Sequence, residues 1–233
     1  MPEHDAHAAA QASALSPRWW WGFVPYALVS LVHIGALAAD ADALASPTKL
    51  LLMPLLAVAV LWAGRGSGGG TPFTLLFVAI ALSYLGDGAG TFFAGMPELP
   101  IMLACFGLAH LAYMWLFWKH LAVRSLPPWT AVYALWWVVL VAVLWPLLGG
   151  LAVAVALYGL VLGGTATLAA RCHPLVAWGG AFFLTSDTIL AFRLFTPDAM
   201  PDWTSPLVML TYCLGQGLIA AGVVVGTRRR NDG

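Results

Sequence analysis

The sequence predicts an all-α polytopic transmembrane bundle of eight helices, and its composition is the first reason. Of the 233 residues, 61% are hydrophobic and only 9% are charged, whereas about 25% of the residues in a typical soluble domain are charged. So few charges cannot cover a soluble globule, and intrinsic disorder requires low hydrophobicity with high charge. Both classes are therefore excluded. Because Lys plus Arg and Asp plus Glu number 10 each, with no basic patch, we expect no nucleic-acid partner.

Long uninterrupted apolar runs are the second reason, because a membrane barrel would instead show short segments of alternating polarity. A bilayer core takes about 20 helical residues to cross. Eight runs fit this length, at residues 20–39, 48–63, 71–88, 99–118, 128–147, 148–169, 174–195 and 206–226. The second run is short, so we expect it to be tilted or partly re-entrant.

Glycine and proline mark the breaks between these runs, at residues 65–70, 95–97, 127–128 and 196–198. The fifth and sixth runs are separated only by a turn at 148–150, which predicts an antiparallel hairpin. We divide the chain into a polar N-terminal tail at 1–18, one transmembrane domain at 19–227 and a basic C-terminal tail at 228–233. The first run is nearly 20 residues long and follows a single Arg, which favours a retained span over a cleaved signal peptide.

The basic residues predict how the bundle is oriented. Eight spans place both termini on one side, and that side would carry Arg18, Arg65, Lys119, Arg124, Arg171, Arg228, Arg229 and Arg230. The other side would carry only Lys49 and Arg193. Cytoplasmic loops are enriched in Lys and Arg. We therefore expect an integral protein of the bacterial inner membrane with both termini in the cytoplasm.

Two acidic residues inside the spans are the leading candidates for function. A charge at the bilayer centre costs about 2.5–3.5 kcal/mol on insertion scales, so it normally faces a cavity or a partner. Asp87 lies near the outer end of the third span, and Asp187 lies just past the middle of the seventh. These spans run in the same direction, so the two carboxyl groups can meet at similar depth. A structural role stays open, with Asp87 at the interface and Asp187 paired to Arg193 or to a neighbouring hydroxyl.

Further polar residues accompany this acidic pair. Lys49 opens the second span at the outer face, where it either serves the site or extends to the lipid headgroups. Residues three or four apart share one face of a helix. This spacing relates three pairs, which are Ser83 with Asp87, His110 with Tyr113, and Tyr212 with Gln216. Each pair either lines a site or joins neighbouring helices.

Several familiar kinds of site are not expected. The three cysteines are scattered, the histidines lack paired helical spacing, and the chain contains no G-x-S-x-G, H-E-x-x-H or P-loop motif. We therefore expect no metal and no cofactor, and we interpret His33 as a helix contact. Two carboxylates with a lysine suit acid–base chemistry without a metal.

Five segments in this order resemble the YhhN family of membrane proteins, which includes the lysoplasmalogenases. The segments are SPTKLL at 46–51, SYLGD at 83–87, FGLAHLAY at 106–113, GAFFLTSD at 180–187 and YCLGQGLI at 212–219. The first departs from the family pattern, because it reads Pro-Thr-Lys where the family has a Lys-Pro pair. The resemblance implies a hydrolase of lysoplasmalogens, which are lysophospholipids with a vinyl-ether chain. It also implies Asp87 and Asp187 as the catalytic pair.

The implied products are a fatty aldehyde and a glycerophospho-ethanolamine or -choline, and the chemistry suits two carboxyl groups. Protonation of the vinyl-ether β-carbon gives an oxocarbenium ion, which water attacks. The acid must stay protonated near neutral pH, and an apolar pocket with a neighbouring carboxylate raises a carboxyl pKa. The ionised partner stabilises the cation, as in glycosidases. We expect Asp187 to be the acid and Asp87 the ionised partner, although the reverse stays open.

The other polar residues receive roles that follow from this hypothesis. Lys49 would bind the substrate phosphate or bias one aspartate toward ionisation. The residues expected to line the pocket are Ser83, His110, Tyr113, Tyr212 and Gln216. Two other functions stay open, because intramembrane aspartates also relay protons in carriers. These are a small proton-coupled transporter and a non-enzymatic lipid-binding protein.

Overall fold

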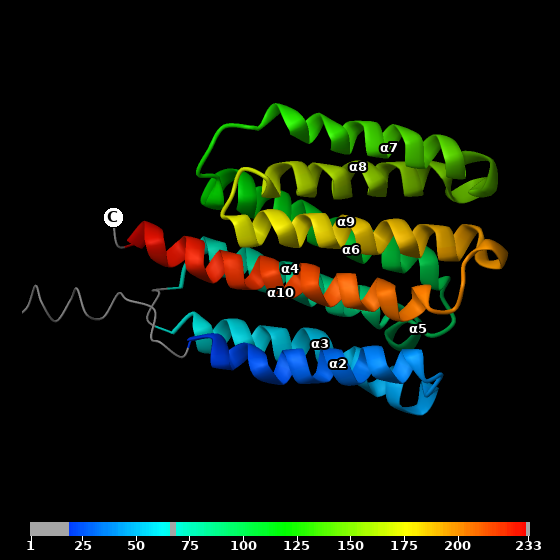
Figure 1. Ribbon diagram of the computed structural model, residues 1–233, viewed down its shortest axis with the longest axis horizontal. Helices are drawn as coiled ribbons and strands as arrows, with labels where there is room; N and C mark the ends of the chain where they lie inside the picture. The colour runs from blue at the N-terminus through cyan, green and yellow to red at the C-terminus, as the bar shows by residue number, and fades with distance from the viewer. Residues whose placement is uncertain (1–18, 66–68, 232–233) are drawn as a thin grey trace, which may run out of the picture.

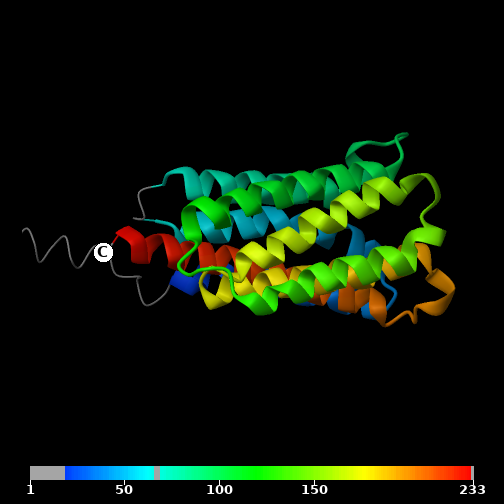
Figure 2. The same cartoon turned by 90° about the horizontal axis from the view of Figure 1, so that it is seen from above.

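The computed structural model describes residues 19–65 and 69–231. Within these ranges the chain forms eight long helices. They lie side by side along the long axis of the molecule in Figure 1, with some tilt between them in the perpendicular view of Figure 2. They are α2 (Val24–Ala38), α3 (Asp42–Ala63), α4 (Thr71–Asp87), α6 (Glu98–Leu116), α7 (Ala131–Leu144), α8 (Ala152–Ala169), α9 (Pro174–Phe195) and α10 (Thr204–Asn231). The short helix α5 (Ala89–Phe92) follows α4, and the described ranges contain no strand.

Short 3-10 turns, and at residues 117–121 a wider π-helical turn, extend several of these helices. They are η1 (Trp19–Phe23), η2 (Phe117–Leu121), η3 (Pro128–Thr130), η4 (Trp145–Leu147), η5 (Gly149–Leu151) and η6 (Pro197–Ala199). With these extensions, seven helical segments in the described chain are long and apolar enough to cross a membrane. The eighth, α4, has 17 residues and spans about 25 Å at about 1.5 Å per residue. The predicted all-α polytopic bundle is confirmed, and each expected span corresponds to one long helix.

The bundle has two distinct ends. Helix α2 begins and α10 ends at the same end of the bundle (Figure 1), which we call the terminal end. The connections α2–α3, α4–α6, α7–α8 and α9–α10 lie at the opposite end, which we call the loop end. The predicted hairpin of α7 and α8 is present, and its turn includes Gly149 with φ +52°, a conformation that glycine adopts without a steric penalty.

The second span differs from its predicted bounds. Helix α3 begins at Asp42 and has 22 residues, so it is not short and shows no re-entrant break. Pro47 lies in the second turn of α3. Proline has no backbone N–H, so one helical hydrogen bond is lost there. The N–H groups of the preceding first turn have no helical partner in any case. Lys49 therefore lies two turns inside the helix, and the expectation that it opens the span was wrong.

The last helix extends beyond the expected boundary at residue 227. Helix α10 continues to Asn231, so the first residues of the expected basic tail are helical. Arg228 is buried, and its Nη2 donates to the carbonyl oxygens of Ala63 at 2.8 Å and Arg65 at 2.6 Å. These carbonyls end α3, where unpaired C=O groups favour a cation. The expected N-terminal tail at 1–18 lies outside the described residues.

Helix α10 is the central element of the bundle. In its membrane-length segment 67% of the residues are buried, against 17% for the segment containing α7. It packs against α2, α3, α4 and α9. Glycine allows the closest of these contacts, because a Cβ on Gly215 would lie 2.9 Å from the backbone nitrogen of Phe183. Polar side chains on α10 therefore face other helices rather than lipid.

Candidate active site

Both intramembrane aspartates lie toward the loop end. Asp87 is the last residue of α4, and Asp187 lies eight residues before the end of α9. Both helices run from the terminal end to the loop end (Figure 1). Counted from their helix starts, the two positions differ by three residues, or about 5 Å along the axis. The two carboxyl groups therefore reach similar depths, which is the geometry the sequence predicts.

Asp87 belongs to a hydrogen-bonded network between α4 and α10. The hydroxyl of Tyr212 donates to Oδ2 of Asp87 at 2.7 Å. One turn deeper, Nε2 of Gln216 donates to Oγ of Ser83 at 3.0 Å. The two helices are antiparallel, so a four-residue spacing on each produces two matching contacts. The shared faces predicted for Ser83 with Asp87 and Tyr212 with Gln216 are thus present.

A third helix completes this network. The hydroxyl of Tyr113 on α6 donates to Oε1 of Gln216 at 2.6 Å. Ser83, Tyr113 and Gln216 have no exposed surface, and Tyr212 is 4% exposed. A buried network with its donors and acceptors paired is rigid, so the carboxyl group of Asp87 is held in a fixed position while remaining half-buried.

Asp187 has a different tyrosine partner. The hydroxyl of Tyr158 on α8 donates to its Oδ2, and Asp187 itself is half-buried. Tyr158 is not among the residues predicted from the sequence, because its span also contains the hydroxyl groups of Thr165 and Thr167 and no spacing singles it out. Arg193 is not the partner of Asp187, because its Nη1 donates to Oγ1 of Thr204 at 2.5 Å and to the carbonyl of Pro201.

Aromatic rings fill the space around the two acids. The ring of Phe183 lies 5.4 Å from that of Tyr212 and 4.6 Å from that of His110, between ring centroids. Phe106 lies 6.0 Å from Tyr212. The ring of His110 also lies 5.8 Å from that of Tyr158. Phe183 and His110 therefore connect the tyrosine that donates to Asp87 with the tyrosine that donates to Asp187.

His110 lies beside this cluster but has no hydrogen-bond partner in the described chain. Its side chain is completely buried, and neither ring nitrogen is paired. Its ring lies 5.8 Å from Tyr158 and 6.3 Å from Tyr113. The predicted pair of His110 and Tyr113 therefore lies on one face, where the histidine packs against the tyrosine that binds Asp187.

Asp187 lines one cavity, and a second, polar cavity lies beside that one. The apolar slot is a cavity of about 50 Å³ between α6, α7, α8 and α9 that includes Asp187 and Tyr158. The polar cavity has a volume of about 290 Å³, lies between α2, α3, α9 and α10, and includes Lys49 and Arg193. Leu190 lines both cavities, so α9 lies between the apolar slot and the polar cavity.

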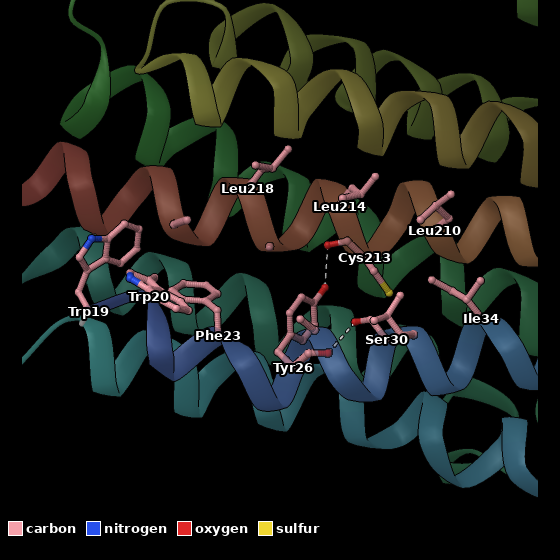
Figure 3. Close-up of a pocket in the computed structure, with 14 residues that line it drawn as sticks. Trp19, Trp20, Phe23, Tyr26, Ser30, Ile34, Leu210, Cys213, Leu214 and Leu218 are labelled. Atoms are coloured by element: carbon pink, nitrogen blue, oxygen red, sulfur yellow. Dashed lines mark hydrogen bonds between the residues drawn. The ribbon is translucent and has the colours of Figure 1, made fainter. Parts of the chain in front are cut away.

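A larger groove of about 420 Å³ lies elsewhere, between α2 and α10. Figure 3 shows Tyr26 donating to the carbonyl of Cys213 at 2.8 Å across it. Its remaining lining is almost entirely apolar, with Trp19, Trp20 and Phe23 near the terminal end. Among the described residues, no carboxylate or cation lines this groove.

No group of three or more His, Cys, Asp or Glu side chains suitable for a metal ion occurs within residues 19–65 and 69–231.

The sequence matches the model of the YhhN family over residues 44–223. This protein belongs to the YhhN family. The match runs from α3 to α10 and includes both aspartates and every other predicted site residue. No curated protein and no solved structure matches the chain. Together with the seven membrane-length helices, family membership identifies an integral membrane protein of the YhhN family.

Proposed function

We propose that this YhhN protein is a membrane-embedded hydrolase that cleaves the vinyl-ether bond of lysoplasmalogens. The products are a fatty aldehyde and glycerophospho-ethanolamine or -choline. The observation that carries the proposal is the placement of two half-buried acids, Asp87 and Asp187, on different helices toward the same end of the bundle. Each accepts a hydrogen bond from one tyrosine hydroxyl, and the rings of Phe183 and His110 connect the two tyrosines.

The first chemical step is a proton transfer to carbon. The carboxylic acid of Asp187 donates its proton to the β-carbon of the vinyl ether, and the double-bond electrons form the new C–H bond. Positive charge develops on the α-carbon and the ether oxygen. The carboxylate of Asp87 stabilises this oxocarbenium ion, because a fixed charge in a dry site acts strongly on a developing opposite charge.

Water completes the reaction and restores both acids. As water attacks the α-carbon, Asp87 accepts one of its protons, which gives a neutral hemiacetal. The hemiacetal hydroxyl then returns a proton to Asp187, and the glycerol oxygen takes the proton held by Asp87 as its bond to carbon breaks. The net reaction adds one water molecule and releases aldehyde and alcohol. General acid–base assistance of this kind contributes about 10²- to 10⁴-fold.

The apolar slot, with its volume of about 50 Å³, admits only the first carbons of the hydrocarbon chain beside Asp187. Its walls include Leu99, Met102, Leu103 and Val155, and Tyr158 and Asp187 are its polar members. A chain bound there presents its first carbons to the acid while remaining out of water. The lipid partner of this protein is therefore a lysophospholipid that enters from the membrane.

We further propose that the protein lies in the bacterial inner membrane with both termini in the cytoplasm. Five of the seven Lys and Arg residues with described side chains lie toward the terminal end, namely Arg65, Lys119, Arg124, Arg171 and Arg228. Lys49 and Arg193 lie toward the loop end. The excess of positive charge favours a cytoplasmic terminal end, which directs the aspartates toward the outer leaflet.

Aldehyde release from purified protein tests the proposed activity. The vinyl-ether lysophospholipid and the matching ester lysophospholipid are incubated separately with the protein, and aldehyde and free fatty acid are measured. We expect aldehyde from the vinyl ether and no fatty acid from the ester. Absence of aldehyde combined with proton-coupled uptake into vesicles would favour the carrier instead.

A further inference from the structure

The polar cavity contains an unusual combination of charges for a membrane protein. Its polar lining consists of Lys49, Arg193, Asp42, His33, Ser46 and Ser205. Asp42 is the first residue of α3, and Ser205 is the second residue of α10. The cavity therefore lies toward the loop end, at the depth where lipid headgroups meet water.

The two cations of this cavity outnumber its one carboxylate, which belongs to Asp42. Lys49 and Arg193 are the only Lys or Arg residues toward the loop end of the described chain, and both line this one cavity. Two like charges repel unless an anion lies between them. Arg193 uses one nitrogen to bind Thr204 and Pro201, which leaves further donors of its planar fork for a phosphate.

Asp42 supplies the acceptor of the cavity. Its side chain is exposed, and a carboxylate accepts hydrogen bonds from N–H donors. His33 lines the cavity from α2, where its Nδ1 lies 3.1 Å from the carbonyl oxygen of Ala45 and 3.1 Å from Oγ1 of Thr48. The imidazole is therefore held between α2 and α3, and Asp42 is left as the group that can accept from a ligand.

We infer that the polar cavity is a headgroup site for phosphoethanolamine. The phosphate binds between Lys49 and Arg193, and the ammonium group binds toward the carboxylate of Asp42. A primary ammonium group donates three hydrogen bonds, whereas the trimethylammonium of choline donates none. The cavity therefore favours ethanolamine lipids over choline lipids.

The position of the cavity links the headgroup to the reacting bond. Leu190 on α9 lines both the polar cavity and the slot that contains Asp187. A lysophospholipid can thus place its phosphate in the polar cavity while its chain lies near the slot. The inference rests on the proposed function for the bond that is cut, whereas binding of the headgroup can be measured without turnover.

Binding of a lipid that cannot be hydrolysed by this route tests the site. The probe is a saturated 1-O-alkyl-glycerophosphoethanolamine, measured by calorimetry with purified protein in detergent. Lys49→Gln and Arg193→Gln should each weaken its binding by about tenfold or more, as expected for losing a charge-assisted contact. Lys119→Gln is the matched control, because Lys119 is exposed at the terminal end over Trp118, and it should leave binding unchanged.

Three further ligands and one further variant separate the contribution of the phosphate group to binding from the other contributions. The 1-O-alkylglycerol, which has no phosphate, should bind equally to the parent protein and to both variants. Arg193→Lys, which keeps the charge, should bind the phospholipid more tightly than Arg193→Gln. Inorganic phosphate should compete less effectively than glycerophosphoethanolamine. Equal loss of alkylglycerol binding in both variants, or tighter binding of inorganic phosphate, would overturn the headgroup assignment.

The preference for ethanolamine has its own variant. Asp42→Asn should reduce the ratio of ethanolamine to choline lipid affinity toward one, and an unchanged ratio would contradict the role of Asp42. Aldehyde release and lipid binding are measured on the same variants, so the hydrolase and the headgroup site are tested separately. Lipid binding that depends on Lys49 and Arg193 without aldehyde release would refute only the hydrolase, and aldehyde release with KM unchanged in both variants would refute only the headgroup site.

Discussion

Each candidate catalytic carboxyl group has one tyrosine hydroxyl as its hydrogen-bond donor, and the two tyrosines come from different helices. Tyr212 on α10 serves Asp87, and Tyr158 on α8 serves Asp187. A single donor orients a carboxyl group while leaving its second oxygen available. This arrangement suits groups that must exchange protons with a substrate or with water.

Removing either acid tests whether the two act together. Asp87→Asn and Asp187→Asn should each lower aldehyde release by about 10²- to 10⁴-fold, because an amide can neither donate the required proton nor accept one from water. The amide oxygen can still accept from tyrosine, so the thermal unfolding midpoint should change little. Asp198→Asn, at an exposed aspartate beyond α9, is the control and should keep full activity. Normal turnover by both site variants would exclude the acid–base pair.

The tyrosine beside Asp187 is expected to position the acid rather than to react. Tyr158→Phe should lower kcat about tenfold while KM changes little, because one hydrogen bond to a charged or ionisable group is worth about 1.5–3 kcal/mol. Tyr84→Phe provides a control on α4, since Tyr84 stacks near Phe92 and the donors to the two acids are other tyrosines. An equal decrease for both variants would indicate a general packing effect.

Some side-chain contacts of the candidate site could be predicted from the sequence, and others could not. Ser83 with Asp87 and Tyr212 with Gln216 were readable because four-residue spacing defines a shared helix face. Tyr158 carries no such periodic signal, and its partner is 29 positions away. Arg193 lies six residues after Asp187 and about 120° around α9 from it, and it binds Thr204 rather than the acid.

The contact between α9 and α10 sets the distance between Asp187 and the tyrosine that donates to Asp87. Asp187 and Phe183 belong to α9, and Tyr212 and Gln216 belong to α10. Their backbones approach closely at Gly179 and Gly215. Close backbone approach at small residues is the usual way in which membrane helices gain packing contacts. A change in this separation should therefore alter both stability and turnover.

Adding one methyl group tests this contact. In Gly179→Ala, the new Cβ would lie 2.8 Å from the backbone nitrogen of Ile219 and 2.9 Å from the carbonyl oxygen of Gly215. Such overpacking should cost about 1–3 kcal/mol and lower both Tm and aldehyde release. Gly35→Ala in α2 is the matched control, because nothing in the described chain lies within 4 Å of the position that its methyl group would take. Its Tm should stay constant or rise, and equal behaviour of the two variants would contradict this packing role.

Helix boundaries show where sequence patterns are weakest. The apolar runs predicted the interior of each span, because that pattern reflects contact with lipid. The first turns of α3 are polar enough to resemble a loop, and Pro47 resembles a helix break. The end of α10 is basic, yet Arg228 is buried because it binds the last carbonyls of α3. These contacts depend on tertiary neighbours that no local pattern reveals.

For the whole molecule, the distribution of polar groups defines two functionally different ends. The terminal end concentrates basic side chains, and several of them bind backbone carbonyls or rest on tryptophan, as Arg124 does with Ala170 and Lys119 with Trp118. The loop end contains the acids, the polar cavity and the apolar slot. The orientation of the bundle therefore decides from which leaflet a lysophospholipid reaches the acids.

Accessibility of single cysteines can establish this orientation. Asp198→Cys at the loop end and Arg124→Cys at the terminal end are introduced separately, with Cys105, Cys172 and Cys213 replaced by alanine. A membrane-impermeant maleimide should label the first position in intact bacterial spheroplasts and the second only after lysis, because the basic end is retained in the cytoplasm. Activity of the cysteine-free protein verifies that the fold is kept. The opposite labelling pattern would place the acids toward the cytoplasmic leaflet, and the substrate would then have to be drawn from the inner lipid pool.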